Sequence, residues 1–424
     1  MLHLSEEWPE KSLLAVTTHI GKNQIKNIPQ HLTWSNAQEI HTSTIHKTTI
    51  ITGPGDIQNE NKLEGIDPSL WEYLKLLADT SNSPLFMESD GSKNRPLKAP
   101  AEHEPAIPHW VNHVVVTVGL SAIGKLLSEE NVHRPEIYST LTGLEIGRPV
   151  TLNSILKMLL NVRGGLKNIP RSARRTVLLN QADTVRDRSS LLAIETQLLT
   201  HFDAVITTSL RKPDEEKEES ERQNEVWRVS EKIAGIILAA GNSKRMGTPK
   251  PLLEWKGIPF VRICALHAIT AGLSPVHIIA GQEFDRIKQA VEDLPVQVIM
   301  NKDWNDGQSS SVRLGIKTLP KKTGGAVFLL VDQPQIPVDL IRKLVAEHTT
   351  SLSSIILPET GGRRANPVLF DRRTYHALSE LQGDSGGRMI FSKYPIRSIP
   401  WYDETILLDV DTQADYERLM QIQT

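Results

Sequence analysis

The segment Gly235–Lys250, GIILAAGNSKRMGTPK, holds the residues best placed for chemistry. Its apolar start predicts a buried strand, and the small residues that follow allow backbone to approach a ligand closely. Polar and cationic side chains come next. This order predicts a phosphate-binding loop that is neither a Walker A loop nor a GxGxxG motif. The residues expected to hold a nucleotide there are Leu238, Ala239, Ala240, Gly241, Ser243, Arg245 and Lys250.

Three aspartates are candidate metal ligands. Asp332 ends the apolar run AVFLLVDQP, and a carboxylate at a buried strand end costs free energy unless it is paired or binds metal. Asp409 and Asp411 lie two residues apart, so in a strand both would point to one face. Magnesium takes one or two protein carboxylates together with substrate phosphates. The sequence therefore predicts Mg²⁺ (or Mn²⁺) on Asp332 with Asp411 or Asp409. Helix caps and turns are the alternative.

Three polar loops add further candidates. NDGQSSSVRLGI opens a predicted helix that its serines can cap, and such a helix start attracts anions or base edges. RRANPVLF and QGDSGGRMI adjoin apolar runs, and each can also be a plain turn. The residues singled out are Gln308, Ser309, Ser310, Ser311, Arg363, Asn366, Asp384 and Arg388. Cys264 falls on the apolar face of a predicted helix, so we expect a core residue rather than a nucleophile.

Composition and charge restrict the class of protein. A chain of 424 residues predicts two domains. The net charge of −2 gives no electrostatic case for binding nucleic acid. The single cysteine excludes an intramolecular disulfide and a multi-cysteine zinc site. No apolar run approaches the roughly 20 residues of a membrane span, and the acidic start does not resemble a signal peptide. We therefore expect a cytoplasmic protein with no membrane partner.

A charged run, RKPDEEKEESERQ, divides the chain. It contains no large apolar residue, so it predicts a solvated linker, which a helix through Trp227 and Val229 can extend. The expected domains are residues 1–210 and 233–424, with a charged linker over 211–232.

Both domains are expected to be α/β. The C-terminal part alternates strand and helix patterns, which predicts a doubly wound, Rossmann-like sheet with ligands at the carboxyl ends of its strands. Its expected strands are 236–238, 276–280, 297–300, 326–331 and 355–357, and its expected helices 260–271, 284–292, 309–318 and 340–348. The N-terminal part has expected strands at 13–16, 85–87, 114–118, 176–179 and 204–207, and helices at 71–78 and 152–160.

The segment from Ile233 to Thr424 resembles the molybdenum cofactor cytidylyltransferases, the MocA-like group of nucleotidyltransferases. LAAGNSKRMGTPK, DGQSSSVRLG, DQP, NPVLF, GDSGGR and DVDT carry the resemblance. It implies transfer of CMP from CTP to molybdopterin, which gives molybdopterin cytosine dinucleotide and pyrophosphate. The related guanylyltransferases carry LAGG where this chain has LAAG, which favours CTP over GTP. Gly387 stands where the family often has alanine, and we expect little effect.

The same resemblance implies roles for the candidate residues. Arg245, Lys250 and Asp332 are the implied catalytic residues, with the first two on the triphosphate. Gln308 and the serines after it would line the cytidine or pterin pocket. The residues implied to contact the cofactor are Arg363, Asn366, Asp384 and Arg388. No general base is required, because the attacking phosphate is already ionised near neutral pH.

Three polar clusters follow predicted strands of the N-terminal part. Hydroxyls with an acidic pair suit a metal and nucleotide site at the ligand edge of a sheet, although each cluster can also be a cap or turn. Their candidate residues are Thr17, Thr18, Glu88, Asp90, Asn180 and Asp183.

Together these clusters resemble the YqeC-like family, accessory proteins linked to selenium-dependent molybdenum hydroxylases. ESDGSKNRPLKAPAEHEPAIP and LLNQAD carry this resemblance. Family members have a GKT-containing phosphate loop, whereas GxxGK[ST] does not occur in this sequence. The resemblance therefore implies a domain like a P-loop NTPase that lacks its P-loop, without the backbone that holds nucleotide phosphates for hydrolysis.

The leading hypothesis is a fused maturation factor for a molybdenum hydroxylase of the xanthine dehydrogenase type, with CTP and Mo-molybdopterin as substrates. One alternative keeps nucleotidyl transfer but uses a sugar or polyol phosphate as acceptor. Another is a non-enzymatic carrier of the finished cofactor. The set of Arg245, Lys250 and Asp332 favours an enzyme, since a carrier needs no magnesium carboxylate.

Overall fold

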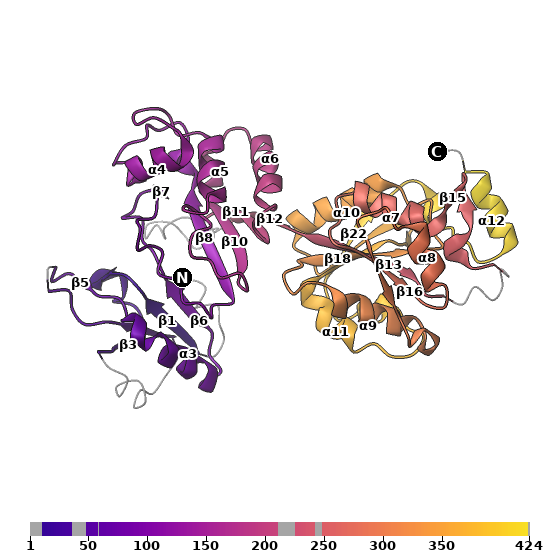
Figure 1. Ribbon diagram of the computed structural model, residues 1–424, viewed down its shortest axis with the longest axis horizontal. Helices are drawn as coiled ribbons and strands as arrows, with labels where there is room; N and C mark the ends of the chain where they lie inside the picture. The colour runs from indigo at the N-terminus through magenta and orange to yellow at the C-terminus, as the bar shows by residue number, and fades with distance from the viewer. Residues whose placement is uncertain (1–10, 36–47, 58, 211–224, 242–247, 423–424) are drawn as a thin grey trace. The chain divides into compact units, whose positions relative to one another are not determined.

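The computed structural model describes residues 11–35, 48–57, 59–210, 225–241 and 248–422 (Figure 1). Two predicted site residues, Ser243 and Arg245, and the whole charged run 211–223 lie outside the described residues. Contacts divide the chain into two compact units. Unit 1 is Met1–Arg175 with Leu179–Ile194, and unit 2 is Thr176–Leu178 with Glu195–Thr424. In the part of the chain described, no helix is both long and apolar enough to cross a membrane.

The first sheet of unit 1 has four parallel strands in the order β3-β4-β1-β6. Its strands are β1 (Ser12–Val16), β3 (Gln30–Thr33), β4 (Thr48–Thr52) and β6 (Leu85–Glu88). Helix α3 (Trp71–Thr80) packs Leu74 and Ala78 on Leu13 and Ala15 of β1. The predicted helix and both predicted strands are confirmed here. β3 and β4 were not predicted, because much of their sequence is polar.

A second sheet has the order β12-β11-β10-β8. Its strands are β8 (His113–Gly119), β10 (Arg174–Asn180), β11 (Ala204–Ser209) and β12 (Glu225–Glu231). Three of these were predicted. The helical extension through Trp227 and Val229 is wrong, because this segment is β12 and pairs antiparallel with β11. Aromatic and β-branched residues favour such pairing over a helix. The predicted domain limits remain a prediction.

Shorter elements complete this half of the chain. They are β2 (Ile20–Gly21), β5 (Lys62–Leu63), β7 (Leu97–Lys98), β9 (Val132–His133), α4 (Pro135–Thr142), α5 (Leu152–Leu160) and α6 (Ser189–Leu198). The predicted helix 152–160 is confirmed as α5.

The main sheet of unit 2 is mixed. Its order is β17-β16-β13-β18-β21-β19-β20, and β22 pairs with β19. The strands are β13 (Ile233–Ala239), β16 (Val276–Ala280), β17 (Gln297–Met300), β18 (Gly325–Leu330), β19 (Ile355–Thr360), β20 (Arg363–Arg364), β21 (Val368–Asp371) and β22 (Ile396–Pro400). β14 (Glu254–Trp255) and β15 (Ile258–Pro259) form a separate hairpin.

The prediction of a doubly wound sheet is confirmed in part: helices flank the sheet, but the sheet is mixed rather than uniformly parallel. β17, β16, β13 and β18 are parallel, but β21 lies antiparallel between β18 and β19. The links from β19 through β20 to β21 are only a few residues long. A parallel neighbour needs a crossover of a dozen or more residues, so these links permit only antiparallel pairing.

Helices cover both faces of this sheet (Figure 1). α7, α8 and α10 contribute to one apolar core, and α9 and α11 to the other. The helices are α7 (Phe260–Thr270), α8 (Phe284–Ala290), α9 (Gln308–Thr318), α10 (Val338–Ser351), α11 (Tyr375–Ser379) and α12 (Gln413–Met420). The predicted strands and helices of this part are all present, with ends that shift by at most three residues.

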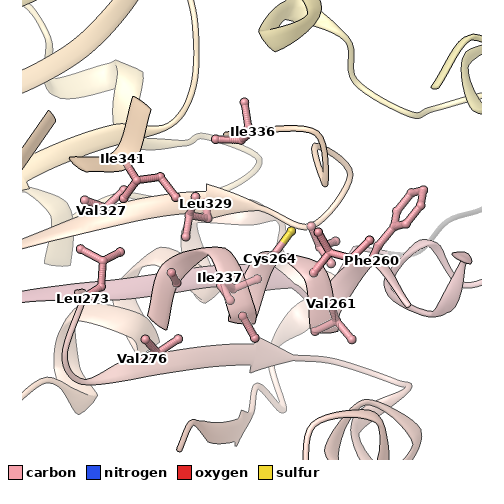
Figure 2. Packing of buried hydrophobic residues seen from close by; sticks show 14 of the residues in the cluster. Ile237, Phe260, Val261, Cys264, Leu273, Val276, Val327, Leu329, Ile336 and Ile341 are labelled. Atoms are coloured by element: carbon pink, nitrogen blue, oxygen red, sulfur yellow. The ribbon is translucent and has the colours of Figure 1, made fainter. Parts of the chain in front are cut away.

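Cys264 is a core residue, as predicted. Its side chain lies among the labelled apolar residues of the α7 core in Figure 2, and 3% of its surface is exposed. Burial raises the pKa of its thiol to about 12, and the charge of Asp332 adds to the shift. The thiol is therefore protonated and unreactive at neutral pH.

One buried carboxylate holds α6 and β12 against β11. Glu195 on α6 is 2% exposed. Its carboxylate accepts hydrogen bonds from Thr207 Oγ1 at 2.7 Å, Ser230 Oγ at 2.7 Å and Arg228 Nε at 3.2 Å. A buried charge is tolerated when it is paired and fully hydrogen-bonded in this way.

Replacing Glu195 with alanine is expected to lower the free energy of unfolding by about 2–4 kcal/mol, because two hydroxyls and a guanidinium lose their acceptor. Glu195→Gln should cost less, since one oxygen remains. Urea unfolding of the full chain measures both. The control is Gln197→Ala at an exposed position of the same helix, with an expected change within about 0.5 kcal/mol. Equal effects of Glu195→Ala and the control would show that the pairing contributes nothing.

Candidate functional site

Two neighbouring parallel strands deliver the candidate residues to one edge of the unit 2 sheet. β13 pairs with β18 in a register that places Leu238 opposite Leu330. Val331 N–H donates to the Leu238 carbonyl at 3.3 Å just past the pair. The chain after β13, with Ala240 and the exposed Gly241, therefore leaves the sheet beside Asp332. This carboxyl edge is where α/β sheets bind ligands.

Lys250 lies between two of the predicted metal ligands. Its ammonium is 3.1 Å from Asp332 Oδ2 and 2.5 Å from Asp411 Oδ1. The Lys250 side chain is 16% exposed, against 23% for Asp332 and 48% for Asp411. Burial acts to lower the pKa of Lys250, but the two carboxylates outweigh it and raise that pKa above its usual value. The side chain is therefore a fixed positive charge at this edge.

Two hydrogen bonds place Asp409 beside Asp332. Val410 N–H donates to the Asp332 carbonyl at 3.0 Å, and Asp409 Oδ1 accepts from Gln333 Nε2 at 2.6 Å. Packing around the Asp409 carboxyl group raises its pKa, and the charges of Asp332 and Asp411 raise it further. The site therefore holds more negative charge than Lys250 balances.

The expectation that Asp409 and Asp411 lie in a strand is wrong. They lie in an irregular segment between a 3₁₀ turn and α12. Neither aspartate caps the helix: the cap of α12 is Thr412, whose Oγ1 accepts from the N–H of Asp415 at 3.3 Å. Gln333 was missed as a positioning residue, although it directly follows Asp332 in the sequence.

The aspartates suit a divalent cation. One cation, the Lys250 ammonium, already contacts both Asp332 and Asp411, so these carboxylates can share a positive charge. Burial and the charges of Asp332 and Asp411 together raise the pKa of Asp409, and a second cation would offset both effects. Magnesium needs only one or two such carboxylates when phosphates supply other oxygens. Metal binding by Asp332, Asp409 and Asp411 remains a prediction.

The serines at the start of α9 do not cap it. Gly307 occupies the cap position and makes no side-chain bond. Ser309, Ser310 and Ser311 lie in the first turn and are 0%, 4% and 5% exposed. Asn301 Nδ2 donates to Ser310 Oγ at 2.8 Å and to Ser311 Oγ at 3.0 Å. The capping expectation is wrong because the helix begins one residue earlier, at Gln308, which turns these hydroxyls inward.

Two predicted residues from distant loops meet at this helix start. Asp384 Oδ1 accepts from the Gln308 N–H at 3.3 Å, and the Ser309 N–H donates to the Gly383 carbonyl at 3.3 Å. Asp384 therefore supplies the anion that a helix N-terminus favours. Both Gln308 and Asp384 remain exposed.

The remaining candidates of unit 2 differ in their surroundings. Arg388 is exposed, and its charge acts to lower the pKa of Asp409, so it is electrostatically coupled to the Lys250 site. Arg363 lies exposed on β20, and Asn366 precedes β21. The described contacts do not join Arg363 or Asn366 to Lys250.

Gly387 lies close to the buried ring of Phe370. A Cβ at this position would lie 2.5 Å from Cζ of Phe370, whose buried ring packs edge-on against Phe328. Alanine there requires that ring or the 387 backbone to move. Glycine is thus the residue that fits here without movement, and the expectation that it has little effect on function stays a prediction.

In unit 1 the structure brings two of the predicted clusters together. Thr17 and Glu88 follow the paired strands β1 and β6, and Thr17 N–H and Oγ1 both donate to the Glu88 carbonyl, at 3.0 and 3.2 Å. Thr18 lies next to Thr17 in the same bend. Burial raises the pKa of Glu88. Asn180 and Asp183 belong to another sheet, at the end of β10.

Sequence reasoning missed the ion network around Glu104. Glu104 is 8% exposed and contacts Arg134 at 2.6 Å and Lys98 at 2.9 Å, and Lys98 also pairs with Asp90. Burial acts to raise the pKa of Glu104, but hydrogen bonds from Arg134 and Lys98 lower it to about 2. The sequence signal is the acidic and basic run KAPAEHE, which contains both Lys98 and Glu104.

A strand-end loop, a fixed lysine and clustered aspartates on a mixed sheet are features of a nucleotidyltransferase domain. Residues 235–398 match the MobA-like NTP transferase domain. The chain belongs to this family through unit 2. Residues 1–136 match the YqeC protein family, which accounts for much of unit 1.

Each curated relative likewise matches only part of this chain. Nicotine blue oxidoreductase of Paenarthrobacter nicotinovorans is 30% identical over 198 residues, 44% of this chain and 96% of the relative. A probable molybdenum cofactor guanylyltransferase of Geobacillus sp. (strain WCH70) is 24% identical over 45% of this chain and 98% of its own. The uncharacterised protein YqeC of Escherichia coli (strain K12) is 32% identical over 29% of this chain, which spans only 47% of that protein.

One similar solved structure is Rv0371C of Mycobacterium tuberculosis H37Rv, crystallised in complex with manganese. It is 25% identical, with 45% of this chain and 100% of that chain covered and a TM-score of 0.40.

Asp409→Asn is expected to raise the melting temperature of the metal-free protein at pH 7. The pKa of Asp409 is raised on folding, so its ionised form destabilises the fold above that pKa, and the penalty disappears as pH falls below the unfolded value near 4. The gain should therefore shrink at low pH. The carboxyl group is partly exposed, so solvent keeps the effect small.

Thermal unfolding in a chelator at pH 7 and at pH 4 measures this difference. The control is Asp339→Asn on α10, whose side chain is 83% exposed. A variant that is less stable than the parent at pH 7 would contradict the charge crowding inferred for this edge.

Proposed function

We propose that unit 2 transfers CMP from CTP to the terminal phosphate of molybdopterin, and so produces molybdopterin cytosine dinucleotide and pyrophosphate. The observation that carries the proposal is the Lys250 ammonium held between Asp332 and Asp411 at the carboxyl edge of β13 and β18. The small-residue loop Leu238–Gly241 leaves the same edge. A fixed cation beside open backbone is an arrangement that suits a triphosphate.

The proposed reaction needs alignment and charge neutralisation more than covalent help. An oxygen of the acceptor phosphate bonds to the α-phosphorus of CTP, and the bond from that phosphorus to the bridging oxygen breaks, which releases pyrophosphate. Lys250 neutralises charge that builds on the α-phosphate oxygens. Because Lys250 is already fixed by two carboxylates, little reorganisation is needed as that charge develops. The acceptor is an ionised phosphate, so no side chain has to remove a proton.

A divalent cation, Mg²⁺ or Mn²⁺, would be held by Asp332 with Asp411 or Asp409. When bound, it supplies charge neutralisation across the triphosphate oxygens. Gln333 would keep Asp409 oriented for this task through its 2.6 Å hydrogen bond.

The choice of acceptor and base rests on the relatives and on the sequence of the loop. Relatives named as molybdenum cofactor guanylyltransferases favour a molybdopterin acceptor. The LAAG form of the loop favours CTP. Gln308 and Asp384 at the start of α9, with Arg388 nearby, would contact the base and the pterin. Arg245 and Ser243 are proposed to complete the triphosphate site.

We further propose that unit 1 assists the delivery of the cofactor to a molybdenum hydroxylase. The match to the YqeC family over residues 1–136 supports this role. Thr17, Glu88 and Asp90 would form its ligand edge, beside the ion network of Lys98 and Glu104. A fused arrangement would keep a labile cofactor at high effective concentration between two sites.

Pyrophosphate release by the full chain tests the transfer. With Mg²⁺, molybdopterin and CTP, release is expected, and Lys250→Gln and Asp332→Asn should each reduce it by about 10²–10³-fold, because each removes a charge that acts on the transferring phosphate. GTP in place of CTP should give a much lower rate. Asp339→Asn, an exposed carboxylate in the same unit, should leave the rate unchanged.

The other outcomes are also decisive. Release with GTP alone would overturn the assignment of the base. Release with CTP only when a sugar or polyol phosphate replaces molybdopterin would change the acceptor. Tight CTP binding without release, unaffected by Asp332→Asn, would favour a carrier of the finished cofactor.

A further inference from the structure

A second cluster of ionisable side chains lies in unit 2. It consists of Glu231 at the end of β12, His348 in α10 and Asp371 at the end of β21. One ligand atom from each lies within 4.8 Å of the other two, and among the described residues no other trio of His, Cys, Asp and Glu is gathered so closely. His348 is 2% exposed and Asp371 6% exposed, while Glu231 is half-buried.

This cluster is separate from the transfer site. Asp371 pairs with Gly325 at the start of β18, whereas Asp332 follows the end of β18. A strand of this length places the two sites roughly 20 Å apart, at opposite ends of β18. The chemistry proposed above makes no use of Glu231, His348 or Asp371.

Asp371 is oriented as a metal-binding carboxylate would be. Its Oδ1 accepts from the N–H and the Nε of Arg373, both at 2.8 Å, which turns Oδ2 toward His348 Nε2 at 2.9 Å. Burial acts to raise the pKa of Asp371, but hydrogen bonds from His348 and Arg373 outweigh it and lower that pKa. The carboxylate is therefore ionised at neutral pH. A partner that fixes one oxygen and leaves the other to a ligand is typical of metal sites.

Glu231 reaches the cluster because residue 324 has no side chain. A Cβ on Gly324 would lie 2.4 Å from the Glu231 Cβ and 2.5 Å from its Oε2. The Gly324 N–H also donates to the Lys232 carbonyl at 3.0 Å, so the two segments are locked together. The Glu231 carboxylate thus lies directly over the 324 backbone.

Two buried polar atoms of the cluster lack a hydrogen-bond partner among the described residues. They are His348 Nδ1 and the hydroxyl oxygen of Tyr375. Burial raises the pKa of Tyr375, and the charges of Asp371 and Glu231 raise it further, so its hydroxyl stays protonated. Buried polar atoms left without partners indicate a missing ligand or its bound water.

We propose that Glu231, His348 and Asp371 bind a divalent transition-metal ion, for which Zn²⁺ is the best match. One imidazole nitrogen and two carboxylate oxygens are ligands that Zn²⁺ accepts, and this ion binds such mixed sites more tightly than Mn²⁺ does. Two ligands about 2.1 Å from a tetrahedral ion lie roughly 3.4 Å apart. His348 Nε2 lies 2.9 Å from Asp371 Oδ2, and the three ligand atoms lie within 4.8 Å of one another, so binding requires only small side-chain movements. A water near Tyr375 would complete the coordination.

Such an ion would join three segments that are far apart in the sequence. β12 directly precedes β13 in the chain, α10 contributes to a core of the main sheet, and β21 is an antiparallel strand of that sheet. Binding to the folded state alone stabilises that state by mass action. The ion therefore has a structural role.

The test measures Zn²⁺ and Co²⁺ binding by the full chain in an Asp332→Asn background, which removes one proposed metal ligand of the transfer site and so weakens binding there. One ion per chain is expected, with a rise in melting temperature. Co²⁺ bound there should show the strong visible absorption of a low-coordinate site with a nitrogen ligand, which an oxygen-only six-coordinate site lacks. Glu231→Gln and His348→Gln should each weaken binding at least tenfold and abolish that absorption.

Matched controls separate this site from adventitious binding. His376→Gln removes an exposed histidine of α11, whose side chain is 87% exposed, and should leave binding unchanged. Gly324→Ala changes no ligand but displaces Glu231, so it should weaken binding. Because His348 is buried, the melting temperature of each metal-free variant is measured as well, and Glu231→Gln at its half-buried position provides the test if His348→Gln unfolds.

Two results would overturn the proposal. One is the absence of a bound ion in the Asp332→Asn background. The other is Zn²⁺ binding that Glu231→Gln and Gly324→Ala leave unchanged. In either case His348 and Asp371 would form only a buried hydrogen-bonded pair that joins α10 to β21.

Discussion

In unit 2 the ammonium of Lys250 lies between Asp332 and Asp411, and without it three carboxylates would face one another at the end of two buried strands. The parallel pairing of β13 with β18 brings the loop after β13 and Asp332 to the same end of the sheet. Burial, and then the charges of Asp332 and Asp411, raise the pKa of Asp409. An edge that carries this excess of negative charge suits cations, and through them phosphates.

The opposite edge of the same sheet handles buried charge differently. There Asp371 is held by Arg373 and His348, and its pKa is lowered rather than raised. Its oxygens have assigned partners, whereas the ring nitrogen Nδ1 of His348 and the Tyr375 hydroxyl have none in the described part of the chain. The edge with Lys250 has excess negative charge and is open to solvent. The edge with His348 is buried and has polar atoms without hydrogen-bond partners among the described residues. This contrast suits a reactive site at one end and a structural ion at the other.

Unit 1 also contains a buried carboxylate, and there two cations neutralise it. Glu104 is almost fully buried and pairs with both Arg134 and Lys98, which hold its pKa near 2. Such a network fixes loop positions, because breaking it leaves a buried charge without a partner. Asp90, one of the predicted ligand residues, is tied to the network through Lys98. The segment that carries Asp90 is therefore tied to an ionic framework.

Sequence patterns predicted the main strands and helices of unit 2 and the residues at the ends of β13 and β18, because apolar periodicity and small residues act locally. Lys250 and Asp332 were recognisable for that reason. Which distant groups meet depends on the folded chain. The pairing of Lys250 with Asp411, the hydrogen bond from Gln333 to Asp409 and the contact of Asp384 with α9 join residues 76 to 161 positions apart. The antiparallel β21 and the trio around His348 likewise depend on how the chain returns through the sheet. No local pattern of residues encodes such long-range contacts; they follow from the packing of strands and helices into one core.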